Sequence, residues 1–184
     1  MKYIIVIGIV IIICLIYFLA MFNKFIRLRN RVNESFATMD VYLKKRWDLI
    51  PNLVEVVKGY SKHENETLKE IVNLRNTTYD DMTDAEKIAT NKKVNSELNK
   101  IMLLAEAYPE LKASTNFLNL SHELTTIEDE IAQSRKYYNA VVRDYNNKVE
   151  MIPSNIVAAL MGLKTEPMFV ASLEEREEVK VKLS

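Results

Sequence analysis

Two histidines are the side chains here with the most familiar metal and acid–base chemistry, and their spacing argues against a metal site. His63 lies in the polar run 61–66, and His122 is followed directly by Glu123. A helical zinc site needs a second histidine four residues on, and di-iron bundles use a Glu-x-x-His pair. Neither histidine has such a partner, so we predict no metal, no cofactor and two surface histidines.

Signatures of other enzyme classes are also missing from the sequence. The chain has three glycines, and none builds a phosphate-binding loop or a nucleophile elbow. The single cysteine, Cys14, lies inside an apolar run, which leaves the polar part without a thiolate metal site or an intrachain disulfide. We therefore predict no catalytic residues and no enzymatic activity.

The charge balance argues against a nucleic-acid partner. Lysine plus arginine equals aspartate plus glutamate, at 25 residues each. A protein that neutralises phosphates normally carries a net basic charge. Lys45 and Arg46 do precede an aromatic residue, Trp47, but Trp47 falls on an apolar stripe, so we expect its ring to be in the core.

The first element that must position these residues is a membrane span. Residues 3–22 carry no charge, and at about 1.5 Å per residue they reach about 30 Å, the thickness of the hydrocarbon core. The run is longer than the apolar part of a signal peptide and does not end in small residues, so we predict an anchor and not a cleaved signal peptide. The predicted anchor comprises residues 1–23 and contacts the lipid bilayer through residues 3–22.

Flanking charge predicts the orientation of the span. Lys2 stands alone before it, whereas Lys24, Arg27, Arg29 and Arg31 follow it with no acidic residue before Glu34. Positive charge favours the cytoplasmic side. We expect a single-pass cell-membrane protein with its N-terminus outside and its helical domain in the cytoplasm.

Apolar residues recur at helical spacing through most of the remaining chain. They predict an all-α domain over residues 24–152, with helices at about 24–49, 51–79, 84–108 and 116–152. Short connections favour an antiparallel up-and-down four-helix bundle. The alternative is a three-helix bundle in which the first helix continues through Pro51 with a kink.

Several local signals mark the helix ends. Thr83 and Glu86 form the capping-box pattern that opens a helix, and Pro109 closes it. Ser154 can start a short apolar helix that Gly162 ends, inside a C-terminal segment 153–184 whose charged tail we expect to be flexible.

Several ordered blocks of sequence resemble the LemA family across about residues 32–169. The resemblance implies a membrane-anchored helical bundle, and it supplies neither an established activity nor agreed catalytic residues. The blocks are Lys45-Arg46-Trp47-Asp48-Leu49-Ile50-Pro51-Asn52-Leu53-Val54-Glu55, residues 105–112, Asn116-Phe117-Leu118, Tyr138-Asn139 with Tyr145-Asn146, and Pro153-Ser154-Asn155.

Two of these blocks surround prolines that an up-and-down bundle would bring to the end far from the membrane. We therefore hypothesise an interaction surface at that tip for protein partners, which would make the chain a membrane-anchored scaffold. Its predicted residues are Lys45, Arg46, Asp48, Asn52, Glu106, Tyr108 and Lys112. The alternatives are that these motifs only specify turns and buried polar pairs, that the bundle binds a small ligand, or that Arg27, Arg29 and Arg31 sense the membrane surface.

Overall fold

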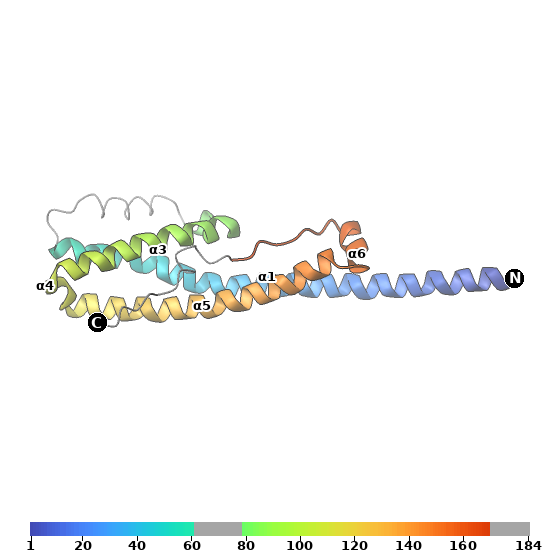
Figure 1. Cartoon of the computed structure of the whole chain (residues 1–184), viewed down its shortest axis with the longest axis horizontal. Helices are drawn as coiled ribbons and strands as arrows, with labels where there is room; N and C mark the ends of the chain where they lie inside the picture. Colours follow the sequence, from blue (N-terminus) through green and yellow to red (C-terminus); the bar gives the residue numbers. More distant parts are fainter. Residues whose placement is uncertain (61–78, 170–184) are drawn as a thin grey trace, which may run out of the picture. The chain divides into compact units, whose positions relative to one another are not determined.

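The computed structural model describes residues 1–60 and 79–169, and the elements in these ranges are helical (Figure 1). They are α1 (Lys2–Tyr60), the 3₁₀ turn η1 (Tyr79–Asp81), α3 (Asp84–Ala107), α4 (Pro109–Lys112), α5 (Thr115–Glu150) and α6 (Ser154–Leu160). The predicted all-α fold is confirmed. The predicted flexible tail and His63 lie outside the described residues.

Helix α1 joins the apolar N-terminal run to the polar part without a break. Within the described ranges, it is the one helix long and apolar enough to cross a membrane. Side chains of residues 3–16, Cys14 among them, project away from the rest of the protein, as lipid-facing side chains do. The chain therefore carries a single-pass N-terminal membrane anchor whose helix continues directly into the bundle.

The predicted helix break before Pro51 is wrong, because α1 continues through this proline to Tyr60. An interior proline costs about 3 kcal/mol through a lost hydrogen bond and a steric clash. Apolar side chains on both sides of it offset that cost, since burying each contributes about 1.5–3 kcal/mol. These buried residues are Leu49, Ile50, Leu53, Val54 and Val57.

The predicted ends of α3 are confirmed. The Thr83 side chain accepts a hydrogen bond from the Glu86 backbone, and the Glu86 carboxylate accepts one from the Thr83 N–H, which completes the capping box. Helix α3 ends at Ala107, two residues before Pro109. Pro109 then opens the single turn of α4.

Two compact units divide the chain, and α1 and α5 contribute to both. The described residues of the first unit are 1–38 and 135–168, and those of the second are 39–60, 79–134 and 169. In the first unit, buried side chains come from three helices: Phe25, Val32 and Phe36 of α1, Tyr138, Val142 and Tyr145 of α5, and Val157 and Ala158 of α6.

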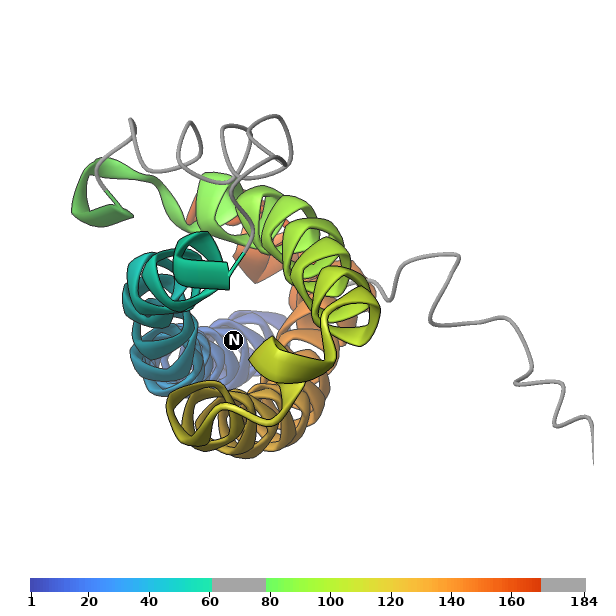
Figure 2. The same ribbon diagram turned by 90° about the vertical axis from the view of Figure 1, so that its left-hand side faces the viewer.

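The second unit is a bundle of α1, α3 and α5 (Figure 2). Asp40 pairs with Lys87 while Arg46 pairs with Asn91 and Asn95, so α1 and α3 run in the same direction. Arg46 also pairs with Glu128 of α5. In an up-and-down bundle, a further antiparallel helix would connect the parallel helices α1 and α3. The connecting residues 61–78 lie outside the described ranges, so the four-helix bundle remains a prediction.

Candidate functional site

An open groove of about 710 Å³ lies between α1 and α5 in the second unit. Its walls are polar and its floor is apolar, because Leu49 and Ile127 are buried whereas most of the other lining side chains are exposed. The lining residues are Lys45, Asp48, Leu49, Asn52, Asn119, His122, Glu123, Thr126 and Ile127.

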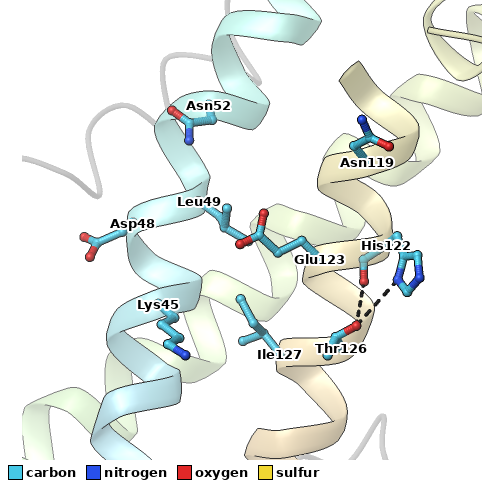
Figure 3. A pocket seen from close by; sticks show the side chains of 9 residues that line it. All are labelled: Lys45, Asp48, Leu49, Asn52, Asn119, His122, Glu123, Thr126 and Ile127. Atoms are coloured by element: carbon cyan, nitrogen blue, oxygen red, sulfur yellow. Dashed lines mark hydrogen bonds between the residues drawn. The ribbon is translucent and has the colours of Figure 1, made fainter. Parts of the chain in front are cut away.

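Helix periodicity explains how two helices build this groove. The α1 residues recur every three or four positions, as do those of α5, so each set forms one face of its helix. Figure 3 shows Leu49, Glu123 and Ile127 pointing into the space between the helices, whereas Asp48 and His122 point away from it. The groove therefore presents a carboxylate above an apolar floor.

Charges of both signs surround the groove. The Lys44 ammonium binds the Asp48 carboxylate at 2.8 Å, and this hydrogen bond raises the pKa of Lys44. The Lys45 ammonium lies 5.5 Å from the centre of the Tyr42 ring, in a cation–π contact. Such an arrangement suits a partner surface with mixed charge better than a single anion.

Three of the seven predicted interaction residues, Lys45, Asp48 and Asn52, line this groove. Glu106 is exposed at the end of α3, Tyr108 lies between α3 and α4, and Lys112 is exposed at the end of α4; these three lie outside the groove. The four lining residues of α5 that face solvent were missed by sequence reasoning. Their polar spacing was the available signal, but any solvated helix face has it.

The placement of Arg46 on an exposed surface is wrong, because its side chain is 2% exposed. The guanidinium donates to the Glu128 carboxylate at 2.6 Å and to the side-chain oxygens of Asn91 and Asn95. A buried charge is stable only when it is paired and hydrogen-bonded. Arg46 thus joins α1, α3 and α5, as the alternative reading of its motif as a buried polar pair predicted.

A second buried polar cluster surrounds Tyr79 in η1. Its hydroxyl donates to Asp40 at 2.6 Å, and Lys87 binds the other oxygen of the same carboxylate at 2.8 Å. The ring contacts Trp47 at 5.6 Å between centres, so Trp47 is in the core as expected. Burial raises the pKa of Tyr79 well above its ordinary value, and the hydrogen bond to Asp40 raises it further.

The described residues hold no group of three or more histidine, cysteine or acidic side chains that would hold a metal ion. His122 is exposed, and its ring lies 3.5 Å from the Thr126 hydroxyl, one turn further along α5 (Figure 3). This local contact does not involve a second histidine.

Comparison with known proteins finds similarity to the LemA family and, over a shorter stretch, to magnetosome proteins. The LemA family model matches residues 35–183. Protein LemA of Metamycoplasma hominis is 28% identical over 158 residues, which cover 85% of this chain and 72% of that protein.

Weaker matches are shorter. Magnetosome protein MamQ 2 of Paramagnetospirillum magneticum is 31% identical over 72 residues, covering 39% of this chain and 26% of that protein. Magnetosome protein MamQ of Magnetospirillum gryphiswaldense is 28% identical over a stretch of the same length. The chain thus spans about a quarter of these magnetosome proteins, whereas the family model covers most of the chain: this protein belongs to the LemA family.

Proposed function

We propose that this protein is a membrane-anchored scaffold that holds a protein partner at the cytoplasmic face without catalysing a reaction. The observation that carries the proposal is the open groove between α1 and α5. Its apolar floor offers a place for one or two apolar side chains, and its charged walls suit a peptide segment with lysine and acidic residues.

The anchor supports this function because a tethered groove meets its partner at high local concentration. Helix α1 carries both the anchor and one wall of the groove in a single uninterrupted helix. A partner that binds this groove is therefore kept at the membrane by the covalent continuity of α1.

The orientation is part of the proposal. Lys24, Arg27, Arg29 and Arg31 are exposed on α1 directly after the apolar run. Translocating these four cations is less favourable than translocating Lys2 alone, so the bundle belongs on the cytoplasmic side.

Site-specific cross-linking in living cells tests the groove. A photoreactive phenylalanine analogue replaces Asn52 or Asn119, both exposed in the groove, and in a control it replaces Asn99, an exposed asparagine of α3 outside it. We expect the same partner band from both groove positions and none from Asn99.

A charge reversal makes the test sharper. Lys45→Glu is expected to abolish the band formed from Asn119 while the bundle melts at an unchanged temperature, because Lys45 is exposed. Equal bands from Asn99 and Asn119, or no band from either groove position, would contradict the proposal.

A further inference from the structure

The short helix α6 presents an apolar face to its surroundings. Val157 and Ala158 are buried, whereas Ile152 is 81%, Ile156 61% and Leu160 73% exposed. Ile156 and Leu160 lie four positions apart, so they form one stripe on the side of α6 opposite its packed side, and Ile152 is exposed in the turn that precedes the helix. Large aliphatic side chains exposed together in this way indicate a surface that something apolar covers.

The C-terminus of α6 is well defined, which fixes where the stripe ends. At the end of the helix, the Leu163 N–H donates to the Ala158 carbonyl and the Gly162 N–H donates to the Ala159 carbonyl. With Gly162 at a φ of +66°, these two bonds form a Schellman motif, which only glycine adopts without strain. The segment after it is held against α5 by paired hydrogen bonds between Asn146 and Glu166.

The register between α1 and α5 places this stripe at the membrane exit. In the first unit, the Tyr138 ring packs edge-on against the Phe36 ring, with 5.8 Å between the ring centres. Seven residues later in α5 and seven residues earlier in α1, Tyr145 interacts electrostatically with Arg29. The two helices are antiparallel and rise equally, so five residues further Glu150, the last residue of α5, is level with Lys24. The turn that leads into α6 begins there. Phe22 is the last residue of the apolar run.

Figure 1 agrees with this register, because α6 lies alongside α1 where the apolar N-terminal part of α1 begins to project alone. The surrounding charge is also suited to lipid headgroups. Lys24 and Arg27 are exposed on α1 near this level, Arg31 is exposed one turn beyond Arg27, and Lys164 follows α6. Exposed acidic neighbours on α5 are Asp144 and Glu150.

We propose that α6 lies in the headgroup region of the bilayer, with Ile152, Ile156 and Leu160 inserted among the acyl chains. The span and α6 then hold the first unit to the membrane at two points, which fixes its rotation about α1. The occupant of the stripe is lipid and not a second copy of the chain, because the stripe continues the lipid-facing surface of the anchor.

Spin labelling of the full-length chain tests this assignment. In a Cys14→Ser background, labels are attached to Ile156→Cys, Leu160→Cys and the control Leu118→Cys, a leucine of α5 that is 53% exposed in the second unit. Each chain is placed in nanodiscs of phosphatidylcholine and phosphatidylglycerol, with one chain per disc. We expect labels at 156 and 160 to collide more with oxygen than with a water-soluble nickel chelate, and the control to show the reverse.

Two results would overturn the proposal. One is a preference for the nickel chelate at positions 156 and 160 equal to that at 118. The other is protection that arises only when discs hold several chains, since it would assign the stripe to a second copy. Labelling the unsubstituted chain with a lipid-soluble diazirine serves as a check free of substitutions, and modification of residues 152–160 is expected there.

Discussion

At the residue scale, Arg46 is the side chain on which the second unit depends most. Arg46→Met is expected to lower the free energy of unfolding by about 3 kcal/mol, because Asn91, also buried, and Glu128 lose their shared partner. Denaturation of the full chain in detergent micelles, followed by far-UV circular dichroism, measures this change. Lys45→Met, at the exposed neighbouring position, is the control and should change it by less than about 0.5 kcal/mol. Equal losses in the two variants would contradict the buried role.

The burial of Arg46 had a partial signal in the sequence. Met39, Leu43, Ile50 and Leu53 recur with the spacing of a heptad stripe, and Arg46 occupies the position between Leu43 and Ile50. A charge at a stripe position indicates a buried polar link. The stripe cannot identify its partners on α3 and α5, because these depend on the register between helices far apart in the chain.

Tyr79 makes the stability of the second unit sensitive to alkaline pH. Burial and the Asp40 carboxylate raise the pKa of Tyr79 above 10, so above pH 10 the unfolded state loses a proton that the folded state keeps. Stability contributed by the neutral hydroxyl is therefore complete below pH 10 and falls as the pH rises beyond it. Tyr79→Phe is expected to cost about 1.5 kcal/mol at pH 7, through the lost hydrogen bond to Asp40, and less at pH 11.

The measurement is chemical denaturation of the wild type and Tyr79→Phe at several pH values between 7 and 11. Tyr137→Phe, at an exposed tyrosine of α5, is the matched control. The difference between its free energy of unfolding and that of the wild type should be the same at every pH. A cost of Tyr79→Phe that stays constant across this range would refute the link between burial and titration.

At the element scale, Pro51 distinguishes a continuous α1 from a broken one. In a continuous helix, Pro51→Ala supplies the missing N–H and removes the ring clash, so the bundle should gain about 1–3 kcal/mol of stability. At a break, the same change would remove a residue that favours the first turn of a new helix and would destabilise the bundle. Chemical denaturation of the wild type and Pro51→Ala shows whether the substitution raises or lowers the free energy of unfolding. Pro109→Ala, at a true helix start, is the comparison that should lower it.

Helix ends were predictable where a local hydrogen bond defines them, and less so where burial decides. The side chains of Thr83 and Glu86 each accept a hydrogen bond from the other residue's backbone N–H, three positions apart. The sequence alone therefore located the start of α3. Pro51 carries an equally local signal, but the buried residues on both sides outweigh it. The groove was half predictable for the same reason: its α1 wall belongs to a recognisable motif, whereas its α5 wall depends on the packing of two distant segments.

At the scale of the whole molecule, the helix that carries the membrane anchor is also a member of the helical bundle. The same helix carries the span in the first unit and Lys45, Asp48 and Asn52 in the second. In this arrangement the orientation of the span determines which compartment the groove can sample, so the topology is the property on which the proposed function depends most.

Cysteine accessibility in intact cells tests that topology. In a Cys14→Ser background, Ser96→Cys places a thiol on the exposed surface of α3, and Lys2→Cys places one before the span. Because four cations follow the apolar run, we expect a membrane-impermeant maleimide to label position 2 in intact cells and position 96 only after permeabilisation. Labelling of position 96 in intact cells would place the bundle outside. Replacing Arg27, Arg29 and Arg31 with glutamine is expected to increase labelling at position 96 in intact cells, since we propose that the charge difference across the span orients the bundle.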